Sequence, residues 1–135
     1  MYYEQILPIP RLTLITAPVV QDLPVTSGNL QHVEVFFPPG CAGLAHLSIW
    51  YWGRQIWPSN PDSFFTADGL AIAFDQDIDI VDPPYIFQLL GWNEDDIFSH
   101  SPIVRMSVIP QDSTMAYFLS SLALGPSGPV SSGGA

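Results

Sequence analysis

Residues 32–40 read HVEVFFPPG, and this stretch decides the fold class. Val33, Val35 and Phe37 stand at every second position, which places their side chains on one face of an extended strand. Two prolines and a glycine then end the strand, because proline cannot donate to a sheet and glycine favours a turn. The unit predicted here is a half-buried β-strand followed by a sharp turn.

The rest of the middle part of the chain shows the same pattern of a short strand followed by a turn. Each further stretch is short, alternates between two faces and is bounded by Pro, Gly, Asn or Asp. These stretches are residues 44–52, 55–57, 70–74, 78–81, 85–92 and 103–109, with a two-residue turn expected at Gly53-Arg54. Residues 78–81 either continue the strand at 70–74 or form the next one. They predict an all-β protein, an antiparallel β-sandwich of immunoglobulin-like or jelly-roll type, and they leave the strand order open.

The two ends of the chain differ from the sandwich domain predicted at residues 31–110. Residues 1–30 contain prolines at positions 8, 10, 18 and 24 among many apolar residues, which predicts an extended N-terminal arm and not a helix or a central strand. Residues 111–135 predict a short C-terminal helix over 114–124, followed by a flexible tail rich in Gly, Ser and Pro. We therefore expect one domain with two appended segments.

The charge balance restricts the partners. Thirteen carboxylates stand against three arginines and no lysine, and the net charge is −10. Such a surface repels phosphate, so neither nucleic acid nor an anionic membrane is expected as a partner. The acidity attracts basic surfaces or divalent cations, or it only keeps the protein soluble. The N-terminal residues lack the pattern of a signal peptide, so we expect synthesis in a host cytoplasm.

The residues needed for common enzyme chemistry are sparse. Cys41 is the only cysteine, and His32, His46 and His100 are too scattered for a zinc motif. No nucleophile or phosphate-binding motif is present. Glycoside hydrolysis needs two facing carboxylates, and the spacing singles out no such pair. We therefore predict that the chain is not an enzyme, with a carboxylate-dependent hydrolase as the weakest of three interpretations.

One row of acidic residues suggests a metal site. Asp75, Asp77 and Asp79 point the same way in an extended strand, and calcium accepts such oxygen ligands. The match to a helix-loop-helix calcium loop fails, because Ile80 stands where a glycine is required. The alternative is an edge strand protected from edge-to-edge pairing by its charges. Calcium is the only cofactor that the sequence suggests.

Aromatic residues gather around the turn expected after residue 52. Alternation places Trp50 and Trp52 on the face opposite Tyr51, so both faces of this hairpin are aromatic. One face is core, and the other is covered by the N-terminal arm, packed against a subunit, or open as a platform for a sugar ring. The predicted assembly interface consists of Ile6, Leu7, Ile9, Leu12, Leu14, Ile15, Trp50, Trp52, Trp57 and Phe118.

Three stretches resemble a group of known proteins. They are residues 36–44 (FFPPGCAGL), 55–60 (QIWPSN) and 92–96 (WNEDD). They resemble uncharacterised small β-sandwich proteins encoded among the structural genes of tailed phages and prophages. The resemblance implies a virion component, for example a capsid decoration protein, a head fibre base or a tail accessory subunit.

Two classes of function follow from these observations. The first is a virion structural or assembly protein that acts by oligomerisation on the virion surface, with copies of itself and other virion proteins as partners. The alternative is a carbohydrate-binding β-sandwich that uses Trp50, Trp52 or Trp57 as a platform, with calcium at the aspartate row.

Overall fold

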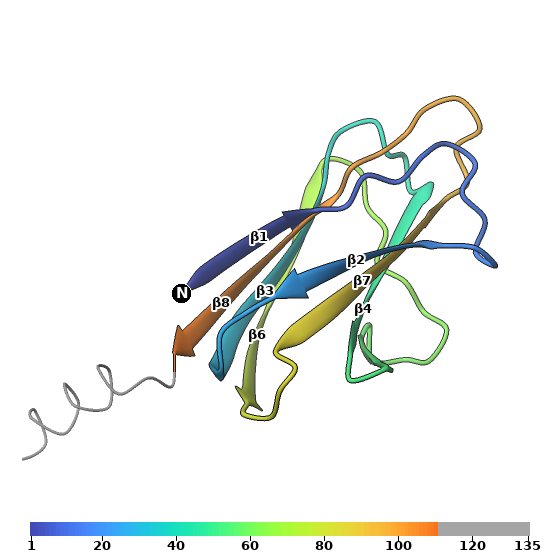
Figure 1. The fold of residues 1–135 in the computed structure, drawn as a ribbon. Coiled ribbons are helices and arrows are strands. Elements are labelled where there is room, and N and C mark those ends of the chain that lie inside the picture. The colour runs from blue at the N-terminus through green and yellow to red at the C-terminus, as the bar shows by residue number, and fades with distance from the viewer. Residues whose placement is uncertain (111–135) are drawn as a thin grey trace, which may run out of the picture.

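The computed structural model describes residues 1–110, which form eight β-strands and no helix (Figure 1). The strands are β1 (Tyr2–Ile6), β2 (Val19–Pro24), β3 (Gly28–Phe37), β4 (Ala45–Tyr51), β5 (Arg54–Trp57), β6 (Leu70–Ile80), β7 (Ile86–Asn93) and β8 (Ile103–Pro110). They form two four-stranded antiparallel sheets, in the orders β1-β8-β3-β6 and β2-β7-β4-β5. The predicted all-β sandwich is confirmed.

The strand pairing distinguishes between the two predicted sandwich types. Each strand of the first half pairs with its counterpart in the second half: β1 with β8, β2 with β7, β3 with β6, and β4 with β5. The chain is therefore one long antiparallel hairpin that is folded over, so that successive pairs enter alternate sheets. This arrangement is a jelly roll and not an immunoglobulin-like sandwich.

The core lies between the two sheets and is made by the alternating positions of the strands. Val33, Val35 and Phe37 of β3, which were predicted to share one face, are fully buried, as are Leu47 and Ile49 of β4. Phe87 and Leu89 of β7 and Val104, Met106 and Val108 of β8 complete the centre of the core. Alternation predicted the buried face of β3 because the other face of this strand is only partly buried.

The N-terminal arm prediction is wrong, because residues 1–30 belong to the sandwich. β1 is hydrogen-bonded to β8 and β2 to β7, so this segment supplies one edge strand to each sheet. Pro8, Pro10 and Pro18 lie between the strands, and Pro24 ends β2. Proline is tolerated in these places, because the segment between the strands has no ladder to interrupt and the edge strand β2 has donors that pair with no neighbour. The predicted boundary at residue 30 therefore does not separate an arm from the domain.

The turn of the β4–β5 hairpin is displaced by one residue from its predicted position. Tyr51 pairs with Arg54, so the two central residues are Trp52 and Gly53 and not Gly53-Arg54. Both have left-handed backbones, with φ of 54° and 71°, as a type I′ turn requires. Trp52 consequently leaves the strand and does not share a face with Trp50.

The C-terminal predictions, the helix at 114–124 with Phe118 and the tail that follows it, lie outside the described residues. Within residues 1–110, no helix is long and apolar enough to cross a membrane.

Candidate functional site

The sandwich has two ends that differ in character. The loop end consists of residues 7–18, between β1 and β2, and residues 94–102, between β7 and β8. The hairpin end consists of the β4–β5 turn and of residues 81–85, between β6 and β7. β7 runs from one end to the other and spans about 27 Å at roughly 3.4 Å per residue (Figure 1).

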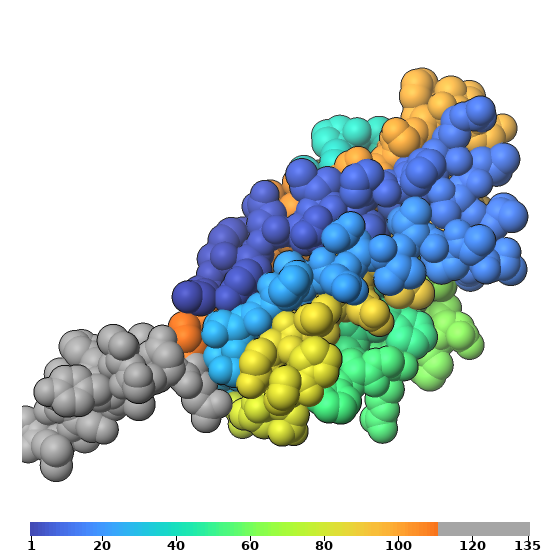
Figure 2. Space-filling model, viewed as in Figure 1, coloured from blue at the N-terminus to red at the C-terminus, as the bar shows by residue number. Residues whose placement is uncertain are grey.

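Large apolar side chains are concentrated at the loop end. We define the loop-end patch as Leu12, Leu14, Ile15, Ile97 and Phe98, whose exposed fractions lie between 52% and 67%. The two loops that carry them lie side by side in the space-filling view (Figure 2). Exposed apolar side chains gathered on adjacent loops are typical of an interaction surface.

Hydrogen bonds hold these two loops together. The Leu12 amide donates to the Asp95 carbonyl at 2.7 Å, and the Arg11 guanidinium donates to the Asp96 carbonyl at 3.0 Å. The Asn93 side chain, which is 1% exposed, donates to the Phe98 carbonyl at 3.0 Å and to the Pro10 carbonyl at 3.4 Å. The patch is thus presented by an ordered pair of loops.

Asp95 organises the loop that carries Ile97 and Phe98. Its carboxylate accepts from the Ile97 amide at 2.9 Å and the Phe98 amide at 3.1 Å, and it lies 2.8 Å from His100 Nε2. The Ile97 amide, the His100 side chain and the Phe98 amide all favour the ionised form, so the pKa of Asp95 is lowered. The loop is therefore fixed most firmly when this carboxylate is charged.

The lowered pKa of Asp95 predicts that the stability of the fold depends on pH. A lowered pKa in the folded state contributes stability above the unfolded pKa of about 3.9, and that contribution is lost as pH falls through the folded value. Asp95→Asn is expected to be less stable than the wild type at pH 7, by a margin that shrinks in urea unfolding at pH 3. Asp96→Asn, which changes a carboxylate without hydrogen bonds to residues 1–110, is the control. A margin that is equal at both pH values contradicts this role.

A pocket of about 520 Å³ opens beside the loop-end patch. Trp92 forms one wall and stacks on His46, with ring centroids 3.9 Å apart and planes 7° apart. His46 Nε2 in turn lies 2.6 Å from Glu94 Oε2. The other lining residues are Leu12, Thr13, Leu14, Ile15, Thr16 and Asn93. The patch and the pocket together form one largely apolar surface that contains a hollow.

The structure divides the predicted interface residues into exposed and buried groups. Ile6, Leu12, Leu14, Ile15 and Trp52 are exposed, and Trp50 is half-buried, with its indole N–H donating to Ser48 Oγ at 3.0 Å. The assignments of Leu7, Ile9 and Trp57 are wrong, because these side chains are at most 6% exposed and belong to the core. Phe118 lies outside the described residues.

Sequence reasoning missed Ile97 and Phe98. They follow three acidic residues, 94–96, and continue no alternating strand pattern. The signal that was available is a pair of adjacent apolar residues in a polar loop, outside any alternating strand.

The predicted metal row lies on the outer face of the edge strand β6. The Asn29 side chain donates to Asp77 at 2.7 Å and to Asp79 at 2.8 Å, and His32 Nδ1 lies 2.8 Å from Asp75. Neighbours on β3 thus reduce the repulsion between like charges. Among residues 1–110, no three His, Cys, Asp or Glu side chains are grouped closely enough to hold a metal ion. Calcium at this row stays a prediction.

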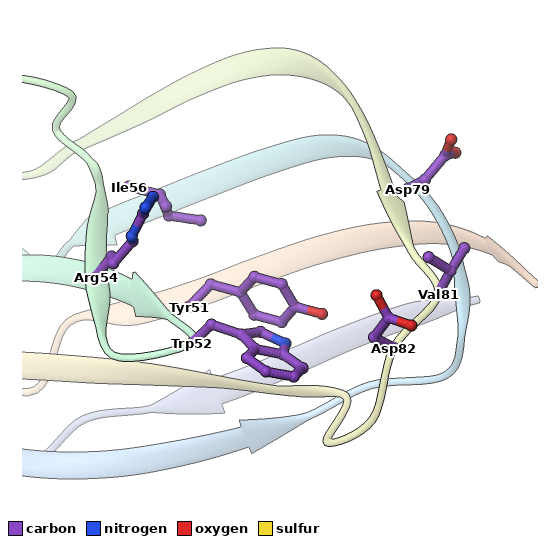
Figure 3. A pocket seen from close by; sticks show the side chains of 7 residues that line it. All are labelled: Tyr51, Trp52, Arg54, Ile56, Asp79, Val81 and Asp82. Carbon is purple, nitrogen blue, oxygen red and sulfur yellow. The ribbon is translucent and has the colours of Figure 1, made fainter.

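A second pocket, of about 490 Å³, lies at the hairpin end (Figure 3). The rings of Tyr51 and Trp52 extend from the end of β4 toward the β6–β7 turn, where Asp82 lines the pocket. Arg54 of β5 stands on the other side of the pocket. Ile56, Asp79 and Val81 complete the lining.

The described residues therefore present two candidate surfaces, one at each end of the jelly roll. No model of a known protein family matches this chain, and no match is found among curated proteins.

Proposed function

We propose that this chain is a structural subunit that assembles through its loop-end patch, with a second copy of the same chain as its partner. The observation that carries the proposal is the set of five large apolar side chains, all more than half exposed, on two loops that are hydrogen-bonded to each other. A monomer gains nothing from holding such a surface in water.

The net charge of the chain favours a partner that binds at the loop end. Two copies with a net charge of −10 each repel one another over most orientations. An apolar patch is complementary to itself, and a two-fold interface needs the same patch on both subunits. Self-association through the loop end therefore brings apolar surface together and leaves most of the remaining charge in water.

The expected association is weak for a single contact. Burying the exposed half of one large apolar side chain contributes about 1 kcal/mol, so ten such side chains in a two-fold dimer contribute roughly 10 kcal/mol. Association itself costs about 4 to 15 kcal/mol. With a cost at the low end of this range, the dissociation constant is on the order of 100 µM, about −5.5 kcal/mol. Repetition in a particle of many copies strengthens such contacts.

The particle in this proposal is a virion, on which the chain acts as a capsid decoration protein, a head fibre base or a tail accessory subunit. Two observations support this class. Jelly rolls are common in viral capsid proteins. The stretches at 36–44, 55–60 and 92–96 resemble small proteins encoded among phage structural genes.

Charges placed in the patch test the proposal. In the double variant Leu14→Asp and Phe98→Asp, self-association is expected to weaken at least ~100-fold, because desolvated carboxylates would face each other across the dimer. Light scattering against concentration measures the effect. The control, Leu70→Asp with Ile109→Asp, adds equal charge at exposed apolar positions outside the patch. The proposal is wrong if the patch variant associates like the wild type, or if the control loses association equally.

A further inference from the structure

The hairpin-end pocket has a feature that the fold does not require. A type I′ turn favours Asn, Asp or Gly at its first central position, yet Trp52 occupies it with a φ of 54°. A left-handed backbone costs a bulky residue roughly 1 to 2 kcal/mol. More than half of the indole stays in water, because Trp52 is 57% exposed. A binding role explains an aromatic ring that is kept in the turn at a cost to stability.

The second ring of the pocket is held in place by the core. Tyr51 is half-buried, and its ring packs on Phe87 with centroids 4.7 Å apart. Trp52 and Tyr51 extend in the same direction, toward Val81 and Asp82 (Figure 3). The pocket therefore combines one fixed ring with one exposed ring beside an aliphatic side chain.

The polar groups of the pocket carry both signs and have free hydrogen-bonding capacity. Arg54 supplies only donors, and the Asp82 carboxylate supplies only acceptors. Neither side chain forms a hydrogen bond or an ion pair with any residue of the described part, 1–110. Asp79 lies at the rim, where it already accepts from Asn29 at 2.8 Å.

This combination selects among classes of ligand. An anion is repelled by Asp79, Asp82 and the net charge of −10. An organic cation over the rings is attracted by these carboxylates, but it is repelled by the Arg54 guanidinium and cannot use its donors. A neutral sugar has C–H faces that pack on aromatic rings, and each hydroxyl both donates and accepts. It can therefore use Arg54 and Asp82 together. The pocket volume of about 490 Å³ lies within the usual range for small-molecule sites.

We propose that the hairpin-end pocket binds a neutral saccharide, with Trp52 and Tyr51 as the stacking surface and with Arg54 and Asp82 as hydrogen-bonding partners for its hydroxyls. This inference is independent of the assembly proposal. The pocket and the loop-end patch lie at opposite ends of β7, about 27 Å apart. A dimer formed through the patch therefore leaves both pockets open.

The first experiment is a titration of the full-length chain. The probes are neutral hexasaccharides of β-linked glucose, α-linked glucose and β-linked N-acetylglucosamine, together with a galactose-based oligosaccharide. Tetramethylammonium chloride and inorganic phosphate represent the competing cation and anion. At least one saccharide is expected to bind and to shift the Trp52 indole N–H resonance. Its affinity is expected to change less than twofold between roughly 0.05 and 0.5 M salt, because no charge is neutralised.

The variant that separates binding from folding is Trp52→Asn. Asn-Gly is the favoured type I′ pair, so the melting temperature is expected to stay equal or rise while saccharide affinity falls at least tenfold. Trp52→Tyr is expected to retain part of the affinity. Arg54→Ala and Asp82→Ala are each expected to weaken binding. Phe98→Asn, which removes an exposed aromatic ring at the opposite end, is the control and is expected to bind normally.

Three results overturn the proposal. The first is that none of the saccharides binds. The second is that only tetramethylammonium or phosphate binds. The third is that a saccharide binds equally well to the wild type and to Trp52→Asn. None of these results bears on assembly, which is read from the mass of the wild-type chain.

Discussion

Leu7→Ala or Ile9→Ala is expected to lower the free energy of unfolding by about 2 to 5 kcal/mol. Both side chains are at most 1% exposed, although they lie in a proline-punctuated segment near the N-terminus. They pack against β7 at Gly91, where a methyl group would lie 2.6 Å from Ile9 Cδ1 and 2.7 Å from Leu7 Cδ2. Truncation leaves a cavity between β7 and this segment.

Urea unfolding at equilibrium measures this effect. The control is Leu12→Ala, which truncates a side chain of the same segment that is 56% exposed, and a change within about 0.5 kcal/mol is expected. If Leu7→Ala and Ile9→Ala are as mild as this control, the N-terminal segment is an appended arm after all.

Gly28→Ala is expected to destabilise the chain by roughly 3 kcal/mol or more. A Cβ at this position would lie 2.0 Å from the Ile109 carbonyl oxygen, which is a backbone atom of the neighbouring strand. The atom cannot rotate away, so β3 and β8 must separate where Gly28 pairs with Pro110. The loss is therefore a loss of sheet pairing and not only of packing.

Gly53→Ala provides the matched control for this steric argument. Gly53 also has a positive φ, but a Cβ there would meet no atom within 4 Å. Its expected cost is about 1 kcal/mol, from the backbone alone. Thermal and urea unfolding of the two variants should therefore differ by about 2 kcal/mol. Equal costs would show that the close approach at Ile109 is relaxed without penalty.

The sequence predicted the strands of the core better than it predicted their neighbours. Val33, Val35 and Phe37 were assigned correctly because period-two alternation directly indicates which face of a strand is buried. β1 and β2 were missed because the prolines were taken to exclude strands from the whole segment. Three of them lie between the strands, and Pro24 is accommodated at the end of an edge strand, which has donors without partners. Whether a strand lies at an edge depends on long-range pairing, which local pattern does not contain.

The two candidate surfaces were predicted only in part. Leu12, Leu14 and Ile15 were named for their apolar character, which is a property of the sequence. Ile97 and Phe98 join them only because β1 and β8 are paired, which brings the two loops to one end. Similarly, Trp52 was predicted as a platform, but its partners Asp79 and Asp82 come from the opposite sheet or the turn that follows it.

The position of the β4–β5 turn also depends on strand pairing that the local sequence does not contain. Gly53 signals a tight turn in either register, Trp52-Gly53 or Gly53-Arg54. The register is set by the pairing of Ile49 with Trp57 in the core, followed by an irregularity between Ile49 and Trp50. Because the turn begins one residue earlier than expected, Trp52 enters the pocket and leaves the strand face it was assigned to.

The two proposals, assembly at the loop end and saccharide binding at the hairpin end, are compatible with each other. A subunit on a repetitive particle presents many copies of its free end, and weak single-site affinity for a saccharide is multiplied by that repetition. The acidic outer surface limits contacts other than those at the patch.

The native mass of the full-length chain tests the central claim of assembly most directly. Sedimentation equilibrium from roughly 10 µM to 1 mM covers the expected dissociation constant on both sides. The weight-average mass is predicted to start near that of the monomer, 14.8 kDa, and to rise toward twice this value as concentration increases. A mass that stays at 14.8 kDa over the whole range would contradict assembly through a second copy of this chain.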